Sequence, residues 1–416
     1  MTNRVFVTGI GMITPLGLDT ARTWNNLING ISGADYIKSF DAANLETRFA
    51  AEVNDFEPTD FISKKSARHM DRFAQFALVA AQEAAWQANF RPENEDLTKV
   101  TTIIGSAVGG LLTLSEQFKT LAERGANRVS PFLVPKMLSD MAASQVSMAL
   151  GTKGVNYSPV SSCSSGAEAI GQAWGMIKRG EANMAIAGGA EAPISPIGIA
   201  GFNACQALSK RNEDPQSASR PFDLNRDGFV MGEGSGILFL ESESSVIRRN
   251  SEVLAELIGY GASSDAFHVT QPDPDGHGAT RALNLALASS GLEPKDIDYI
   301  NAHGTSTKLN DEVETKAIKS VFNNHANSLA ISSTKSMTGH LLGAGAALEA
   351  AISVVILEKG IVPPTINLNT KDPKCDLDYT PTTAKRLRVE VAMSNALGFG
   401  GHNSSLILRS NDKIQI

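Results

Sequence analysis

The fold class is decided by residues 155–187, which read VNYSPVSSCSSGAEAIGQAWGMIKRGEANMAIA. This stretch predicts a short strand, a serine-rich turn, a helix with apolar residues at helical spacing, a stop at Lys178-Arg179-Gly180 and a second strand. The helix is rich in Gly and Ala, which allow neighbouring backbones to approach closely. Strands separated by such helices are typical of βαβ units whose sheet is buried on both faces.

A second stretch has the same order of features. Residues 329–361 contain a strand, a Ser-Ser-Thr-Lys turn, a Gly- and Ala-rich helix and a stop at Glu358-Lys359-Gly360. Two similar α/β halves predict a duplicated, layered sandwich with helices buried between sheets; the alternative is a chance likeness of two ordinary βα units. The polar run Glu241–Glu252 is the candidate boundary, so we expect one half in residues 1–250 and the other in residues 251–416.

Short β-branched runs and alanine-rich runs alternate along the rest of the chain. The expected strands are Arg4–Thr8, Thr101–Ile104, Met184–Ala187, Gly236–Leu240, Asp298–Ala302, Ala330–Ser332, Val389–Met393 and Ser405–Leu408. The expected helices are Ala67–Ala88, Ala167–Lys178, Ala279–Ser290, Asp311–Val321 and Leu341–Leu357.

Composition excludes several classes of protein. The 416 residues include 37 basic and 44 acidic side chains, a net charge of −7, with 42% apolar residues, so a packed chain that does not bind nucleic acid is expected. The run 184–208 is uncharged except for Glu191 and is broken by Pro193 and Pro196, so no membrane span is expected. The N-terminus does not read as a signal peptide, and three widely separated cysteines predict neither disulfides nor a zinc site, so we expect a cytoplasmic protein.

Cys163 is the first candidate for chemistry. The helix is expected to begin near Ser162, with serines available to cap it, so Cys163 would lie where unpaired N–H groups and the positive end of the helix dipole converge. Such a place is expected to lower the thiol pKa from about 8.5 and to hold a developing oxyanion. The alternative is a small buried side chain without chemistry.

Two histidines lie in comparable settings. His303 follows the expected strand Asp298–Ala302, and His340 precedes the expected helix Leu341–Leu357. Sites in α/β folds gather at such element ends. The remaining cysteines and histidines lack such settings and are interpreted as structural: Cys205, Cys375, His69, His268, His277, His325 and His402.

Together these residues resemble a known family. Five motifs are similar in order and spacing to the β-ketoacyl-[acyl-carrier-protein] synthases, most of all the synthase II type: Ser161–Gly166, Asp223–Glu233, Asn301–Thr307, Lys335–His340 and Gly398–Gly401. The resemblance covers essentially the whole chain. It implies a thiolase-like duplicated α-β-α-β-α sandwich, a homodimer, and a decarboxylating Claisen condensation that extends an acyl chain by two carbons.

The resemblance also implies roles for single residues. Cys163 would carry the acyl group, His303 and His340 would stabilise charge on the malonyl thioester oxygen, and Lys335 would orient and tune His340. The backbone N–H groups of Cys163 and Phe399 would form the oxyanion hole, and Phe399 would also act as a mobile gate, unless it is only a packed aromatic in a glycine turn. The substrate is expected to contact Val108, Phe202, Phe229, Thr305, Thr307 and Phe399, with Val108 small enough for medium or long acyl chains.

The family also supplies expectations about cofactors and partners. No cofactor is required, because phosphopantetheine arrives on the carrier protein, and a monovalent cation could bind near Asn301, Glu349, Ser394 and Asn395. The alternative for Glu349 is the exposed edge of its helix. Carrier docking is assigned to Lys64, Lys65 and Arg68, with Arg72 spaced to share their helical side; the alternative is an ordinary solvated helix face.

Some residues depart from the family pattern. Lys308 and Asn310 stand where relatives usually have Pro and Gly, and Gln206 replaces a common basic residue. Ser162 and Ser164 differ from the commoner alanines of synthase II, which bears on substrate range. Ser164-Ser165 after the cysteine resembles polyketide-type condensing enzymes, so a stand-alone polyketide-type ketosynthase subunit stays an alternative. A non-catalytic chain-length partner is the other alternative, although such partners lack the thiol. A dehydrogenase is disfavoured, because the glycine motif after the first strand lacks its third glycine, with Thr14 in that place.

Overall fold

The computed structural model describes residues 3–413. In the first half, the helices and strands are β1 (Val5–Ile13), α1 (Thr20–Ile28), β2 (Asp35–Tyr36), β3 (Phe49–Ala50), α2 (Lys64–Arg68), α3 (Arg72–Gln87), β4 (Val100–Gly105), α4 (Leu111–Arg124), α5 (Leu133–Met137), α6 (Met141–Leu150), β5 (Asn156–Tyr157), α7 (Ser165–Lys178), β6 (Met184–Glu191), α8 (Pro196–Ala204), β7 (Gly234–Ser242) and α9 (Glu243–Arg249). In the second half they are β8 (Ala255–Ser264), α10 (His277–Ser290), β9 (Tyr299–Asn301), α11 (Lys308–Phe322), β10 (Ala330–Ser332), α12 (Lys335–Thr338), α13 (Gly345–Lys359), β11 (Ile361–Val362), β12 (Lys385–Arg386), β13 (Val391–Gly398) and β14 (His402–Ser410).

The two halves of the main sheet repeat one another. The first half runs β5-β4-β6-β7-β1 and the second runs β10-β9-β13-β14-β8. In each half the first three strands are parallel and the last three are antiparallel. The halves join through two residue pairs between β1 and β8. Duplication is therefore confirmed, and chance likeness of two βα units is wrong.

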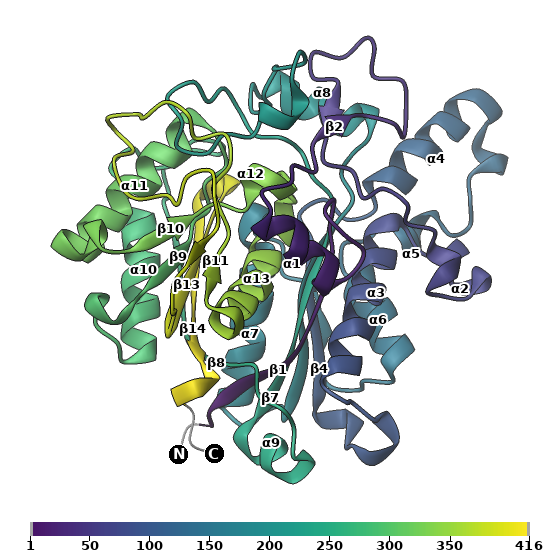
Figure 1. Cartoon of the computed structure of the whole chain (residues 1–416). Coiled ribbons are helices and arrows are strands. Elements are labelled where there is room, and N and C mark those ends of the chain that lie inside the picture. The colour runs from purple at the N-terminus through teal and green to yellow at the C-terminus, as the bar shows by residue number, and fades with distance from the viewer. Residues whose placement is uncertain (1–2, 414–416) are drawn as a thin grey trace.

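The elements form five layers (Figure 1). Helices α3 and α6 cover one outer face, α10 and α11 cover the other, and α7 and α13 lie between the two halves of the sheet. α13 is buried from Gly345 to Leu357, as expected of a helix that is apolar all round. Gly166 on α7 faces α13 so closely that a Cβ there would lie 2.7 Å from the Ala347 Cβ. Small residues therefore make this central layer possible.

Several element boundaries differ from the sequence-based expectations. The expected helix Ala67–Ala88 is two helices, α2 and α3, because Asp71 caps α3 by accepting a hydrogen bond from the Phe73 N–H. The strand β8 was not expected, since Gly259 and Gly261 lower strand propensity. A Cβ at Gly261 would lie 2.3 Å from the Ala282 carbonyl oxygen, so these glycines let α10 pack directly on the strand.

The boundary between the halves runs through a short helix. The expected polar segment Glu241–Glu252 contains the end of β7, then α9, and then the approach to β8. The division at residue 250 stays a prediction. Within residues 3–413, we find no helix with both the length and the apolar character needed to cross a membrane.

Candidate active site

Cys163 lies in a tight turn at the start of the central helix α7. A 3-10 turn over Ser162–Ser164 precedes α7, and Ser162 adopts a left-handed φ of +54°. The expected serine capping is wrong, because no side chain caps α7. Ser165 instead braces the turn: its Oγ accepts a hydrogen bond from the Ser161 N–H and donates one to the Ser162 carbonyl.

The turn is enclosed by strand ends from both halves. A Cβ at Gly105, the last residue of β4, would lie 2.4 Å from the Ser165 carbonyl oxygen. A Cβ at Gly398, the last residue of β13, would lie 3.1 Å from the Cys163 nitrogen. The nucleophile candidate therefore lies at the junction of the two sheets, and larger residues at these glycines would displace it.

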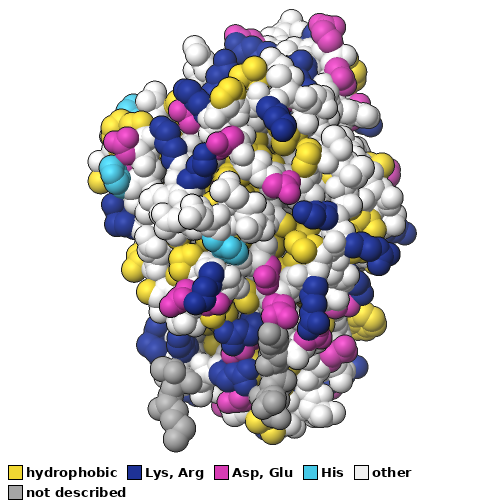
Figure 2. Space-filling view, turned by 60° about the vertical axis from the view of Figure 1, so that its left-hand side comes forward, with side chains coloured by type: hydrophobic (Ala, Val, Ile, Leu, Met, Phe, Trp, Pro, Cys, Tyr) yellow, Lys and Arg dark blue, Asp and Glu magenta, His cyan; other side chains and the backbone are white. Residues whose placement is uncertain are grey.

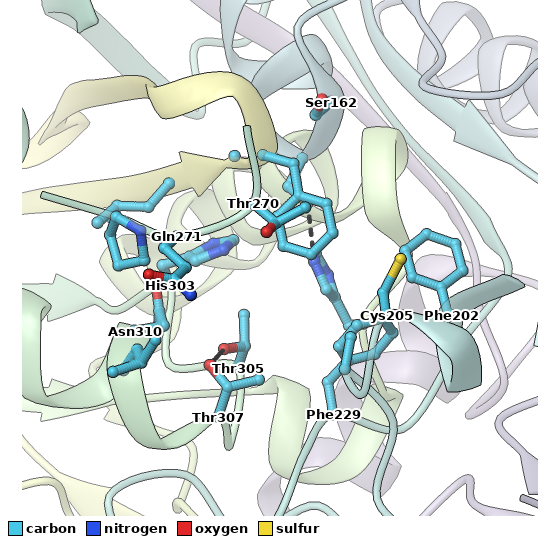
Figure 3. Close-up of a pocket in the computed structure, with 18 of the residues that line it drawn as sticks. Ser162, Phe202, Cys205, Phe229, Thr270, Gln271, His303, Thr305, Thr307 and Asn310 are labelled. Atoms are coloured by element: carbon cyan, nitrogen blue, oxygen red, sulfur yellow. Dashed lines mark hydrogen bonds between the residues drawn. The ribbon is translucent and has the colours of Figure 1, made fainter. Parts of the chain in front are cut away.

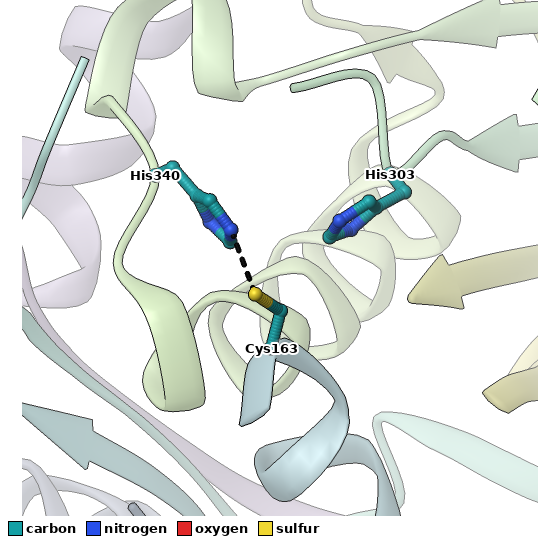
Figure 4. A group of neighbouring side chains, drawn as sticks. All are labelled: Cys163, His303 and His340. Atoms are coloured by element: carbon teal, nitrogen blue, oxygen red, sulfur yellow. Dashed lines mark hydrogen bonds between the residues drawn. The ribbon is translucent and has the colours of Figure 1, made fainter. Parts of the chain in front are cut away.

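Both expected histidines approach the sulfur (Figure 4). The His340 Nε2 lies 3.1 Å from the Cys163 Sγ. The His303 and His340 rings are perpendicular, with centroids 5.4 Å apart, and ligating atoms of the three residues lie within 4.8 Å of one another. Residues 140 and 177 positions away in the chain thus meet Cys163 in one site.

The site suppresses charge on all three groups. Burial raises the pKa of Cys163 to about 11, although the Lys335 charge and the backbone N–H groups of Phe399 and Cys163 act in the opposite direction. The expected lowering of the thiol pKa by the helix terminus is therefore wrong, because desolvation outweighs it. Burial and the Lys335 charge lower the pKa values of His303 and His340 well below the ordinary value, so both imidazoles are neutral at pH 7.

Lys335 is part of a buried ion pair. Its Nζ contacts the Glu349 Oε1 on α13, and both side chains are 2% exposed. The exposed-edge alternative for Glu349 is therefore wrong. Burial raises the pKa of Glu349 to about 7, against the Lys335 charge. A Cβ at Gly345 would lie 3.5 Å from the His340 Nδ1 and 3.8 Å from the Lys335 Cε, so Gly345 lies beside both side chains.

Glu314 is a site residue that the sequence analysis missed. It lies on α11 and accepts hydrogen bonds from the His303 and Gly304 N–H groups, each at 2.8 Å. Burial raises its pKa to about 7. A signal was present, because Glu314 shares the buried face of α11 with Ile318. Glu314 fixes the turn that presents His303.

Cys163, His303 and His340 line one cavity of about 480 Å³ (Figure 3). Every residue expected to contact substrate also lines it: Val108, Phe202, Phe229, Thr305, Thr307 and Phe399. The Thr305 and Thr307 hydroxyls are hydrogen-bonded at 2.9 Å. Phe399 is half-buried and precedes Gly400 and Gly401, both with positive φ. Four of the five departures from the family pattern also line this cavity: Ser162, Gln206, Lys308 and Asn310.

Among the residues that the structure describes, two groups of side chains have metal-ligand chemistry. One is the Cys163–His303–His340 cluster, and the other is the more exposed Asp273–Asp275–His277 group. The expected cation residues are buried on neighbouring elements: Asn301 on β9 lies opposite Ser394 on β13, next to Asn395. Both polar atoms of the Asn301 side chain and the Glu349 Oε2 have no hydrogen-bond partner among residues 3–413. These buried atoms suit a small cation or water.

The expected docking residues separate into two groups. Lys64, Lys65 and Arg68 are exposed on α2, and no ion pair involves them within the described range. Arg72 does not belong to that surface, because the break before α3 turns it inward. Its guanidinium forms a 3.0 Å ion pair with Glu233 and donates to the Val53 carbonyl.

This fold and site define the class of thiolase-like condensing enzymes, with the candidate cysteine on one half and two histidines on the other. Family models described as Beta-ketoacyl synthase, N-terminal domain and Beta-ketoacyl synthase, C-terminal domain match residues 2–245 and 254–369. The chain belongs to the β-ketoacyl synthase family.

Curated relatives resemble the chain along nearly its whole length. The 3-oxoacyl-[acyl-carrier-protein] synthase 2 of Synechocystis sp. is 48% identical over 406 residues, 98% of each chain. The protein of the same name from Staphylococcus aureus (strain N315) is 47% identical over 406 residues, again 98% of each.

Solved structures share the fold. A β-ketoacyl synthase from Burkholderia phymatum has a TM-score of 0.90 at 35% identity, over 99% of this chain and all of that one. A second match is a chain in the structure of a type II polyketide acyl carrier protein in complex with its ketosynthase bound to the hexaketide. It has a TM-score of 0.92 at 34% identity, over 99% of this chain and 100% of that one. The expected thiolase-like fold is confirmed.

Proposed function

We propose that the protein is a 3-oxoacyl-[acyl-carrier-protein] synthase of the type 2 kind, which condenses an acyl chain on Cys163 with malonyl-[acyl-carrier-protein] in fatty acid synthesis. The observation that carries this is the 3.1 Å contact between the Cys163 Sγ and the His340 Nε2, with His303 beside them in one cavity. The names of relatives at 47–48% identity support the pathway.

Acyl transfer requires the thiol to lose its proton as it attacks. With a pKa raised to about 11, Cys163 is almost wholly protonated at pH 7. The neutral His340 ring at 3.1 Å can accept the proton and return it to the departing pantetheine sulfur, so one thioester replaces another without net charge. The backbone N–H groups of Cys163 and Phe399, which favour negative charge at the sulfur, would hold the oxyanion.

Condensation then uses both imidazoles as donors. Loss of carbon dioxide from the malonyl thioester leaves an enolate, whose oxygen can accept N–H hydrogen bonds from His303 and His340. Its carbon attacks the acyl-Cys163 thioester, releasing the 3-oxoacyl product and the thiolate. The Nδ1 atoms of both histidines have no partner among the described residues, so nothing there holds either ring in one tautomer. His340 can therefore accept a proton in one step and donate in the next.

The reaction requires no cofactor of the enzyme's own, because phosphopantetheine arrives on the carrier protein. A monovalent cation would bind near Asn301, Glu349, Ser394 and Asn395. The unpartnered atoms of Asn301 and Glu349 support this site. The cation would neutralise charge beside the Lys335–Glu349 pair.

Acyl carrier protein is the proposed partner. A ketosynthase with the same fold has been solved with a carrier protein. The exposed Lys64, Lys65 and Arg68 on α2 offer positive charge to an acidic carrier. Val108 in the cavity wall supports acceptance of medium or long acyl chains.

The enzyme is proposed to be a homodimer. Large apolar side chains are exposed on α4, on α6 and beside β5, including Phe118 (62%), Met148 (67%) and Val160 (58%). β5 is also the edge strand of the main sheet, with one side unpaired in this order of strands. A second copy would cover both features. Sedimentation should give twice the 44.1 kDa chain mass, and a monomer would contradict the dimer.

A cytoplasmic location belongs to the same proposal. All three cysteines are free thiols, which suits a reducing compartment. A stand-alone polyketide ketosynthase subunit is the second candidate, supported by the 34% identity to a type II polyketide ketosynthase structure of the same fold. A non-catalytic chain-length partner is disfavoured by the intact thiol–imidazole contact.

Intact-protein mass spectrometry tests the function. After incubation with acyl carriers of several lengths, the wild type should gain the acyl mass on Cys163, and malonyl-carrier should then release a product longer by two carbons. Cys163→Ala should gain no mass. Cys205→Ala should still gain it, because Cys205 also lines the cavity but the thiol in contact with the His340 Nε2 is that of Cys163. Normal elongation by Cys163→Ala would refute the proposal.

A further inference from the structure

We propose that Glu191 is a positioning residue that ties the acyl-binding wall at Ala107–Val108 to the His340–Gly343 segment, and thereby contributes to acyl-chain selectivity. This inference rests on the proposed function and deepens it. Glu191 is the last residue of β6 and is 0% exposed. It lies where the carboxyl ends of β4 and β6 meet, beside the cavity that contains the thiol.

The Glu191 carboxylate organises the turn after β4. Its Oε1 accepts hydrogen bonds from the Ser106 hydroxyl (2.8 Å) and the Val108 N–H (3.2 Å). Its Oε2 accepts one from the Ala107 N–H (2.7 Å). The Ser106 Oγ in turn accepts a hydrogen bond from the Gly109 N–H, so the whole turn is arranged around one buried side chain.

The same carboxylate reaches the other half of the molecule. Its Oε2 also accepts a hydrogen bond from the Gly343 N–H at 3.0 Å. A Cβ at Gly343 would lie 2.5 Å from the Ala107 nitrogen and 2.6 Å from the Glu191 Oε2, so the two segments are in direct contact. Glu191 therefore links β6 and the turn after β4 to a segment that begins with His340.

The linked segment holds a strained residue. Leu342 adopts φ +46°, which costs a leucine of order 1–3 kcal/mol and persists only when its surroundings hold it. Leu342 lines the cavity together with Val108 and His340. The hydrogen bond to Gly343 restrains the residue that follows this strained position. Through these hydrogen bonds Glu191 positions two parts of the cavity wall, Ala107–Val108 and the segment that runs from His340 to Gly343.

No cation neutralises Glu191, since it forms no ion pair with a residue in the 3–413 range. Burial raises its pKa to about 7, against the four donors. When ionised it also raises the pKa of Cys163, whereas Lys335 lowers it, and His303 and His340 face the same sulfur. The ionised Glu191 carboxylate therefore disfavours the thiolate of Cys163, so promoting ionisation of the thiol is not its role. The hydrogen bonds that Glu191 accepts explain its position better.

Three variants separate positioning from folding. Glu191→Leu removes all four acceptor contacts. Glu191→Gln can keep its carbonyl oxygen toward Ala107 and Gly343, while its NH₂ group faces Ser106 and the Val108 N–H, so only Val108 loses its partner. The matched control is Glu83→Gln, because Glu83 also accepts hydrogen bonds from two backbone N–H groups, those of Met12 and Thr20, but does not line the cavity.

Two measurements follow the variants. The first is acyl loading of Cys163 by mass spectrometry, with a series of acyl-carrier substrates, which reports chain-length selectivity. The second is the rate of Cys163 alkylation by iodoacetamide as a function of pH, which reports the thiol–imidazole site without a carrier. Glu191→Leu should slow loading by roughly 10²-fold, the scale of a 1 Å misplacement. It removes the same negative charge as Glu191→Gln, so its alkylation profile should also move to lower pH, while its maximal alkylation rate should fall. Glu191→Gln should change the ratio of long-chain to short-chain loading by at least about threefold, and its alkylation profile should move to lower pH. Glu83→Gln should match the wild type in both.

The length profile decides the outcome. A Glu191→Gln profile identical to that of the wild type overturns the proposal, whether or not Glu191→Leu folds. Failure of the function is distinguishable, because a wild type that gains no acyl mass refutes the condensing activity. In that event the iodoacetamide rate still tests Glu191, and a folded Glu191→Leu protein with the wild-type rate overturns its positioning role.

Discussion

Cys163 and His340 form a neutral pair at 3.1 Å rather than a thiolate and an imidazolium. Burial raises the thiol pKa and lowers the imidazole pKa, so both changes favour the uncharged forms. The thiolate therefore forms mainly above neutral pH. The rate of iodoacetamide alkylation in the wild type should rise with pH and reach half its maximum near pH 11, whereas a plateau below pH 7 would contradict the neutral pair.

The two histidines should differ in the step they limit. Of the two histidines, His340 is the one hydrogen-bonded to the sulfur, so His340→Ala should slow both acyl loading and release of labelled carbon dioxide from malonyl-carrier. His303→Ala should slow carbon dioxide release by roughly 10²–10³-fold, the scale of one lost donor, and slow loading much less. Equal losses of both activities in both variants would contradict this division.

The buried Lys335–Glu349 pair gives a separate prediction. Lys335→Met leaves Glu349 unpaired, which should cost about 3–5 kcal/mol of unfolding free energy. It should also raise the Cys163 pKa further, because a positive charge is removed. The double variant Lys335→Met/Glu349→Leu should recover most of the stability, measured by denaturant unfolding, without restoring activity. If activity returned with stability, Lys335 would have no role beyond folding.

At the scale of elements, glycines determine how closely the layers approach. Gly171 on α7 faces β8, and a Cβ there would lie 2.5 Å from the Tyr260 ring. Gly171→Ala should therefore destabilise the protein by about 1–3 kcal/mol through overpacking, despite the better helix propensity of alanine. The measurement is the urea midpoint of unfolding.

Gly201 is the matched control in another helix. It lies within α8, and a Cβ at this position would have no atom of a neighbouring element within 4 Å. Gly201→Ala should stabilise the protein by about 0.5–1 kcal/mol, because alanine loses less backbone freedom on folding. Destabilisation of similar size in both variants would show that helix position, and not contact with the neighbouring layer, governs these glycines.

At the scale of the whole molecule, the net charge of −7 does not attract an acidic carrier, so docking depends on a local surface. The face in Figure 2 has acidic side chains interspersed with basic ones, without one large basic area. On α2, in contrast, Lys64, Lys65 and Arg68 follow one another without an acidic residue between them. We therefore expect α2 to be the surface on which the acidic carrier protein docks.

Charge reversal on α2 tests the surface. Lys65→Glu/Arg68→Glu should raise the KM for the carrier-bound substrate roughly tenfold at low salt and leave kcat nearly unchanged, since like charges oppose association. Added salt should reduce the difference. The control is Lys153→Glu, an exposed lysine before β5, at the end of that strand away from Cys163. Equal KM values in both variants would exclude α2 as the docking surface.

The sequence alone determined nine of the ten strands of the main sheet, the helices α3, α7, α10, α11 and α13, the duplication, and the identity of the thiol and two imidazoles. Each of these features leaves a local mark: periodicity for a helix, a glycine stop for its end, a strand end for a site residue. The glycines of β8 allow contact with a neighbouring helix and do not form a turn. They interrupt the pattern of β-branched residues that predicts a strand, so β8 was not expected. The break between α2 and α3 was missed for a related reason, because the apolar pattern continued across it.

Only the tertiary structure decided the charge states and the partners of buried groups. The pKa of Cys163 depends on burial by both halves and on Lys335, 172 positions away, so a local turn could not give even its direction. The inward turn of Arg72, the Lys335–Glu349 pair and the contacts of Glu314 and Glu191 depend in the same way on residues distant in sequence. Desolvation and Coulomb energy are sums over everything near a group in space, whereas a sequence pattern reports only its neighbours along the chain.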